Sequence, residues 1–147
     1  MNRKRLLHLS SVAFAVATAM PIPVFAAELI VNVTGIGDAP GQIGCALFKG
    51  PQGFPMDSSA ARQAWLPADP KGVTCRFADV TDGSYAVSVS HDRNGNKKVD
   101  TNFLGIPTEA WGVSNNARPS LRAPRFEEAV FKMADNKDLT IDIRVTK

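Results

Sequence analysis

The 147-residue sequence has only two cysteines and two histidines. His91 is the only histidine after residue 26, so a zinc site would lack the sulfur and imidazole ligands it needs. No segment reaches the roughly 20 consecutive apolar residues of a membrane-spanning helix, and no basic stripe suggests nucleic acid. These absences exclude a zinc protein, a nucleic-acid binder and a mature chain that spans a membrane.

The first 26 residues have the pattern of a secretory signal peptide. A basic start at Arg3, Lys4 and Arg5 precedes an apolar segment, residues 6–20, and the small residue Ala26 ends the leader. We expect cleavage near Ala26, which leaves one domain, residues 27–147, in the periplasm or outside the cell. The three basic residues leave with the leader, so the formal charge of +3, less 3, falls to near zero.

Cys45 and Cys75 are predicted to form a disulfide, because an exported chain meets oxidising conditions. Each cysteine lies on the apolar face of an alternating run, in residues 43–47 and 73–77. We therefore expect the bridge in the core, where it joins either neighbouring strands or two facing sheets.

Short runs in which apolar and polar residues alternate are typical of half-buried strands. Six occur, in residues 29–33, 43–47, 73–77, 85–89, 129–133 and 139–145. The one helical candidate, residues 57–66, has Asp57 or Ser58 to cap it and Pro67 to stop it. The pattern predicts an all-β fold, an antiparallel β-sandwich of the immunoglobulin-like or transthyretin-like kind, with one short helix in a crossover loop.

Residues 91–125 contain no convincing strand, and a connection of this length in a small domain is usually functional. Oxygen-bearing side chains follow one another there with the spacing of a calcium loop. The candidate ligands for Ca²⁺ are Asp92, Asn94, Asn96, the backbone carbonyl of Lys98, Asp100, and Glu109 folded back as a closing carboxylate. Gly95 stands at position four and Phe103 at position twelve, so the loop is not an EF-hand.

Two other interpretations stay open. The same Asp and Asn side chains can accept from backbone N–H groups two residues further on and form a metal-free turn network. Glu109 with Asp92 or Asp100 could also act as the acid and nucleophile of a small carboxylate-dependent hydrolase of envelope glycans. Nothing in the sequence fixes the separation of these carboxylates, and we predict no catalysis.

Candidate ligand contacts follow in "EAWGVSNN", where Trp111, Asn115 and Asn116 stand close together. Trp111 is either a platform for a sugar ring or an apolar ligand, or a cover for one end of the core. His91 has the strand parity of Val89, so we expect it to point inward and to be hydrogen-bonded beneath the loop.

The run "GSYAVSVSHDRNGNKKVDTNFLGIPTEAWGVSNNA" and the later "FEEAVF" closely resemble the bacterial exported family known as domain of unknown function 2141. The matching positions are Gly83, Tyr85, Ala86, His91, Asp92, Asn94, Asn96, Asp100, Gly105, Pro107, Glu109, Gly112, Ser114, Asn115, Asn116, Ala129 and Phe131. The likeness implies an exported single-domain β-sandwich, and it carries over no activity. Val113 stands where such sequences more often have an aromatic residue, and the cysteine pair looks like a local addition.

Together these features predict an exported, non-catalytic β-sandwich module. Residues 91–116, which we call the 91–116 unit, are its expected binding or structural site and are stabilised by Ca²⁺. The partner is an unknown envelope component or small ligand, and the oligomeric state is open.

Overall fold

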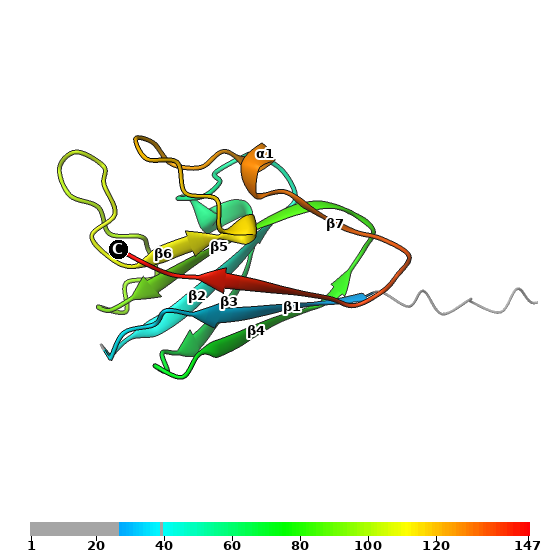
Figure 1. The fold of residues 1–147 in the computed structure, drawn as a ribbon, viewed down its shortest axis with the longest axis horizontal. Helices are drawn as coiled ribbons and strands as arrows, with labels where there is room; N and C mark the ends of the chain where they lie inside the picture. Colours follow the sequence, from blue (N-terminus) through cyan, green and yellow to red (C-terminus); the bar gives the residue numbers. More distant parts are fainter. Residues whose placement is uncertain (1–26, 39) are drawn as a thin grey trace, which may run out of the picture.

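The computed structural model describes residues 27–38 and 40–147, and it consists of two β-sheets packed face to face (Figure 1). The predicted signal peptide, residues 1–26, lies outside the described residues. No helix in the described ranges is long and apolar enough to cross a membrane.

The elements follow one another along the chain as short strands with three brief helical turns. They are β1 (Ala27–Thr34), β2 (Gln42–Phe48), the 3-10 turn η1 (Ser58–Ala60), β3 (Arg62–Pro67), β4 (Val73–Val80), β5 (Gly83–Asp92), β6 (Trp111–Val113), η2 (Ser114–Asn116), α1 (Phe126–Ala129), β7 (Phe131–Met133) and β8 (Leu139–Arg144).

One sheet has the strand order β4-β1-β8, and the other has the order β3-β2-β5-β6 with β7 paired to one end of β5. Most neighbours are antiparallel, but β1 and β8 run parallel, with Leu29 opposite Leu139 and Val33 opposite Ile143. The prediction of an all-β sandwich is confirmed. The parallel pair is an addition to the antiparallel pattern that the sequence suggested.

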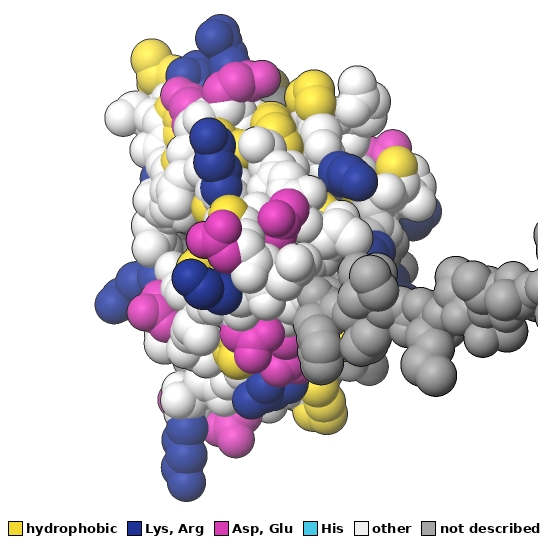
Figure 2. Space-filling view, turned by 90° about the vertical axis from the view of Figure 1, so that its right-hand side faces the viewer, with side chains coloured by type: hydrophobic (Ala, Val, Ile, Leu, Met, Phe, Trp, Pro, Cys, Tyr) yellow, Lys and Arg dark blue, Asp and Glu magenta, His cyan; other side chains and the backbone are white. Residues whose placement is uncertain are grey.

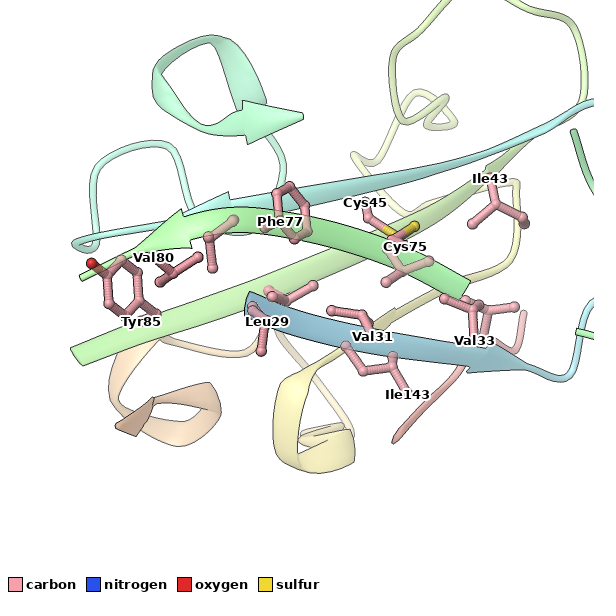
Figure 3. Packing of buried hydrophobic residues seen from close by; sticks show 14 of the residues in the cluster. Leu29, Val31, Val33, Ile43, Cys45, Cys75, Phe77, Val80, Tyr85 and Ile143 are labelled. Carbon is pink, nitrogen blue, oxygen red and sulfur yellow. A yellow bond between two sulfur atoms is a disulfide. The ribbon is translucent and has the colours of Figure 1, made fainter. Parts of the chain in front are cut away.

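The core lies between the two sheets and is built from the apolar residues of the alternating runs (Figure 3). Leu29, Val31 and Val33 of β1 are all buried, while the residues between them are partly exposed, as a period of two requires. Cys45 of β2 and Cys75 of β4 form a buried disulfide that joins the facing sheets. The predicted bridge is therefore confirmed.

The helix predicted over residues 57–66 is wrong except for one turn. Asp57 caps that turn, η1, by accepting from the backbone N–H of Ser59 at 3.0 Å. The chain then enters β3, which pairs with β2 and sets Trp65 opposite Gly44. A Cβ at Gly44 would lie 2.4 Å from the indole ring, so the missing side chain makes room for the tryptophan. Pairing with β2 thus outweighs the local helical preference.

The expectation that residues 91–125 contain no strand is also wrong, because β6 lies within them. β6 pairs with β5, and Trp111 exchanges two backbone hydrogen bonds of 3.0 Å with Thr146, just after β8. β6 therefore links the edges of the two sheets and fixes where the long loop returns to the sandwich.

Candidate functional site

The long loop connects two adjacent strands, β5 and β6, at one end of the sandwich. Its base is closed by the backbone N–H of His91, which donates to the carbonyl of Ala110 at 2.9 Å. In Figure 1 the loop is the yellow-green segment that projects at the left. Both ends of the loop are thus held by the sheet, and the side chains between them decide its shape.

Asp92, the last residue of β5, is fully buried and organises the first turn of the loop. Its Oδ1 accepts from the backbone N–H groups of Gly95 at 2.8 Å and Asn96 at 3.2 Å, and its Oδ2 accepts from Lys97 at 2.7 Å. Short polar side chains that accept from nearby backbone N–H groups are the usual way to hold such turns. One buried carboxylate therefore holds three consecutive backbone amides.

Asp100 receives both asparagine side chains of the loop. The Nδ2 group of Asn94 donates to it at 2.6 Å, and that of Asn96 donates at 2.8 Å. The opposite ends of the two amides accept from backbone N–H groups, Asn94 from Asn96 at 3.0 Å and Asn96 from Lys98 at 2.8 Å. The amides thus link the turn around Asp92 to Asp100.

Glu109 folds back over this turn and is buried. Its Oε1 accepts from the backbone N–H of Arg93 at 2.8 Å, and its Oε2 accepts from that of Asp100 at 3.5 Å. The carboxylate therefore spans the beginning and the end of the first turn. Glu109 and Asp92 serve here as acceptors for backbone donors, and neither lines the groove of ≈ 570 Å³ formed by residues 104–107, Trp111 and residues 118–124.

The oxygen donors that the sequence predicts for Ca²⁺ come together in one loop, and their chemistry suits a hard cation. The two asparagine amides are oriented for hydrogen bonding and not for metal binding, because Asn94 and Asn96 direct N–H groups toward Asp100. Within the described residues, no group of three or more His, Cys, Asp or Glu side chains is placed to hold a metal. Binding of a cation would therefore require the two amides to turn.

His91 points into the sandwich and is buried, as its parity predicts. Its Nε2 has no hydrogen-bond partner in the part of the chain that the structure describes. The expected hydrogen bond beneath the loop is therefore not made by this atom.

Trp111, Asn115 and Asn116 lie beyond the loop, in β6 and η2. The Nδ2 of Asn115 donates to the carbonyls of Glu128 at 3.3 Å and Val130 at 3.0 Å. Asn116 bonds to the backbone of β8 through both ends of its amide. Both asparagines have a positive φ, which Asn tolerates better than most residues. They hold neighbouring segments together, and a ligand contact by them stays a prediction.

Arg118 covers Trp111, with its guanidinium carbon 4.4 Å from the ring centroid. It also donates to the carbonyls of Trp111 and Thr146, each at 3.3 Å. Trp111 itself is half-buried and packs on a second, smaller apolar cluster. One face of the tryptophan is thus already occupied by a cation, which the sequence pattern did not indicate.

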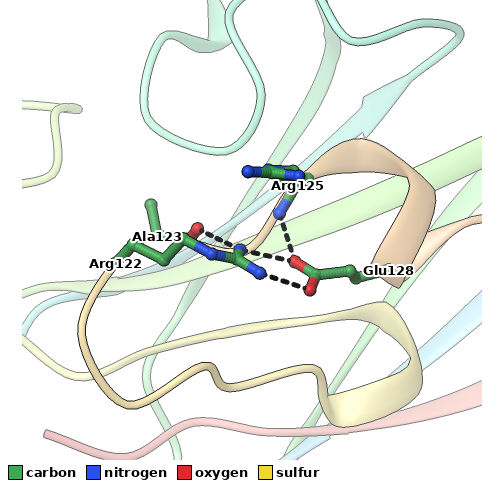
Figure 4. Close-up of polar contacts among 4 residues, drawn as sticks. All are labelled: Arg122, Ala123, Arg125 and Glu128. Atoms are coloured by element: carbon green, nitrogen blue, oxygen red, sulfur yellow. Dashed lines mark hydrogen bonds and ion pairs between the residues drawn. The ribbon is translucent and has the colours of Figure 1, made fainter.

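A second projecting segment, residues 118–124, follows η2 and is held in place by Glu128 (Figure 4). We call it the 118–124 arm. Arg122 donates to both carboxylate oxygens of Glu128 at 2.7 and 2.8 Å, and the backbone N–H of Arg125 donates to one of them at 2.7 Å. These bonds, led by the one from Arg122, lower the pKa of Glu128 to about 2. The arm is therefore held by an ion pair that persists well into acid.

The tip of the long loop, residues 101–107, and the 118–124 arm face each other across a groove of ≈ 570 Å³. Leu104 and Ile106 of the tip, Arg118, Leu121 and Arg122 of the arm, and Trp111 of β6 all line it. Asn102, for which the sequence suggested no role, shapes the tip by accepting from the backbone N–H groups of Leu104 and Ile106. The sequence signal for this role is an Asn that stands two residues before a backbone N–H in a turn, as Asn102 stands before Leu104.

The model of a family described as "uncharacterized protein conserved in bacteria (DUF2141)" matches residues 31–142, a range that includes every site residue above. No curated protein and no solved structure matches the chain.

Proposed function

The chain belongs to the bacterial DUF2141 family, and we propose that it is an exported, non-catalytic β-sandwich module that binds an envelope component or a small ligand through the 91–116 unit. Export rests on the leader sequence, residues 1–26. The binding role rests on how the unit is built.

The observation that carries this proposal is the internal bracing of a long loop by buried carboxylates. Ordering each backbone residue costs about 1 to 2 kcal/mol in conformational entropy. A short connection between the two strands would lower this cost, so a long ordered loop indicates a function. Here Asp92 and Glu109 together accept five backbone N–H groups and hold the loop to one conformation. A braced loop on a rigid sheet is the usual form of a binding site.

The same bracing argues against a hydrolase. A glycosidase needs two carboxylates that face a substrate across about 5 to 10 Å. Asp92 and Glu109 are both buried and both occupied by backbone donors. Neither is free to meet a sugar, so the non-catalytic interpretation is the better supported one.

We propose further that Ca²⁺ stabilises the unit, with Asp92, Asn94, Asn96, Asp100 and Glu109 and the carbonyl of Lys98 as its ligands. The observation in favour is the convergence of both asparagine amides on Asp100, in the same loop whose backbone Asp92 and Glu109 hold. Turning each amide about its last bond would present oxygen in place of nitrogen, a change of little volume because the two ends are nearly the same size.

The rival is the same unit without metal. It is favoured by the hydrogen bonds from Asn94 and Asn96 to Asp100, which a cation would have to replace. The two proposals differ in one respect that can be measured: only the first makes folding stability depend on calcium.

Thermal unfolding of the chain without residues 1–26, first in EDTA and then in excess calcium, separates them. For an extracellular site the Kd is about 10⁻⁴ M. A free calcium concentration about one hundred times this Kd raises the free energy of unfolding by about 2.7 kcal/mol. The midpoint should then rise on the order of 10 °C. Magnesium at the same concentration should give a smaller rise, because Mg²⁺ demands near-ideal octahedral geometry and gives up its bound waters reluctantly.

The matched variants use aspartates from opposite ends of the domain. Asp92→Ala with Asp100→Ala should abolish the calcium response, and Asp135→Ala with Asp138→Ala, in the turn before β8, should keep it. An equal response in both pairs, or none in the parent protein, would leave the metal-free unit as the better proposal.

A further inference from the structure

Four large apolar side chains stand out from the end of the domain that carries the loop. Phe103 is 95% exposed and Leu121 is 99% exposed, while Leu104 and Ile106 are 66% and 55% exposed. Phe103, Leu104 and Ile106 belong to the tip, residues 101–107, and Leu121 belongs to the 118–124 arm. Such exposed apolar groups usually mark a surface that meets a partner or a membrane.

Four backbone N–H groups of the tip, at residues 102, 104, 105 and 106, are paired by hydrogen bonds within the tip. The side chain of Asn102 accepts from Leu104 at 2.9 Å and from Ile106 at 3.1 Å. The carbonyl of Asn102 accepts from Gly105 at 2.9 Å, and its N–H donates to Ile106 at 2.9 Å. Backbone groups that enter a lipid interface without partners are costly. This tip can therefore leave water without exposing unpaired N–H groups at residues 102, 104, 105 and 106.

Charge is segregated in the same region. Residues 93–125 contain six Lys and Arg and only two carboxylates, and the latter, Asp100 and Glu109, accept hydrogen bonds inside the loop. All six cations are exposed; they are Arg93, Lys97, Lys98, Arg118, Arg122 and Arg125. Arg122 is paired with Glu128, and the other five have no ion pair among the described residues. The outward charge of residues 93–125 is therefore positive.

We propose that this end of the domain docks on the surface of an anionic lipid bilayer, with Phe103, Leu104, Ile106 and Leu121 in the headgroup region and the surrounding cations on lipid phosphates. Apolar side chains flanked by Lys and Arg are the composition that binds this interface. The inference rests on the proposed role of the 91–116 unit as the binding face, and it does not require calcium.

The opposite end of the domain has a different surface. It faces the viewer in Figure 2, where acidic and basic side chains lie next to one another and hydrophobic ones are scattered. Such a surface has no reason to prefer an anionic membrane. The two ends therefore predict one orientation, in which the loop end meets the bilayer and the turn 134–138 points away from it.

A second copy of the chain is the less suitable occupant. Protein interfaces are closely packed surfaces in which side chains fit against one another. Phe103 and Leu121 are almost as exposed as in an extended peptide, so they project singly instead of forming a flat face. A fluid bilayer accommodates such projections without a complementary shape.

Flotation with lipid vesicles in EDTA tests the proposal. The probes are vesicles of phosphatidylcholine alone and of phosphatidylcholine with roughly one third phosphatidylglycerol, and all proteins lack residues 1–26. The parent should float only with the anionic vesicles and should be released by about 0.5 M salt, which screens the attraction. Phe103→Ser with Leu121→Ser should lower the bound-to-free ratio on the order of tenfold or more, with an unchanged melting midpoint because both side chains are exposed.

A charge comparison provides the matched control. Lys97→Gln with Lys98→Gln should lower binding roughly fivefold for each lysine, and Lys132→Gln with Lys137→Gln, two exposed lysines of β7 and the 134–138 turn, should leave it unchanged. Flotation of the parent that is absent, equal with neutral vesicles, or unaltered in the Phe103 and Leu121 variant overturns the proposal. So does a lipid-free dimer that this variant dissociates. Because EDTA is present throughout, loss of flotation and loss of the calcium response are separate results.

Discussion

Replacing Asp92 by alanine should destabilise the domain more than any other single change in the loop. The carboxylate is fully buried and accepts three backbone hydrogen bonds, from Gly95, Asn96 and Lys97. Hydrogen bonds to charged groups contribute about 1.5 to 3 kcal/mol each. The three donors belong to exposed residues, which water can reach in the variant. We therefore take about 1 kcal/mol for each bond, or about 3 kcal/mol in all.

Urea unfolding in EDTA at neutral pH measures this loss without any contribution from a metal. A change of about 3 kcal/mol lowers the midpoint by roughly 1 to 3 M urea for a domain of this size. The matched control is Asp138→Ala, because Asp138 is exposed and accepts one backbone N–H, from Glu28 at 2.7 Å. The Asp138→Ala substitution should lower the free energy of unfolding by less than about 1 kcal/mol. If the Asp92 variant lost no more than the control, Asp92 would not organise the loop.

Two further predictions concern the disulfide of the core and the 118–124 arm. Replacing Cys45 and Cys75 together by alanine should lower stability by about 3 to 4 kcal/mol in denaturant unfolding, since their disulfide closes a loop of 30 residues; a loss below about 1 kcal/mol would contradict this. The pKa of Glu128 is lowered to about 2, below its usual 4.5, so the ion pair with Arg122 stabilises the fold fully above pH 4.5 and is lost as pH falls through about 2. Carbon-13 NMR should show the Glu128 carboxyl titrating near pH 2, and a midpoint near 4.5 would show that Arg122 does not hold it.

The strands of the core were predictable because their residues alternate strictly. Leu29, Val31 and Val33 reach the interior from β1, and the same period places Cys45 and Cys75 where they meet. The strand β3 was missed for a physical reason. It is an edge strand with no buried residue, so its sequence carries no alternation, and the Asp57 cap suggests a helix instead. Only the pairing partner, with Gly44 opposite Trp65, makes it a strand.

The sequence predicted which residues belong to the site, but it did not predict which hydrogen bonds they make. The spacing of Asp92, Asn94, Asn96 and Asp100 marked the loop as one unit, and Glu109 folds back over it. The direction in which an asparagine amide turns is not encoded in spacing, since either end can face a neighbour. The stacking of Arg118 on Trp111 depends on the path of the chain after η2, which short-range pattern does not determine.

The measurement that tests the central claim most directly is a calcium titration of residues 27–147 followed by the backbone amide signals in NMR. Calcium bound by the 91–116 unit should shift the amides of Gly95, Asn96 and Lys97, whose N–H groups contact Asp92, and the shifts should saturate. Saturation is expected in the range of about 10⁻⁴ to 10⁻³ M calcium. Amides of the disulfide-bridged core should stay in place. Signals that do not move, or that drift without saturating across the whole domain, would contradict a calcium-stabilised loop.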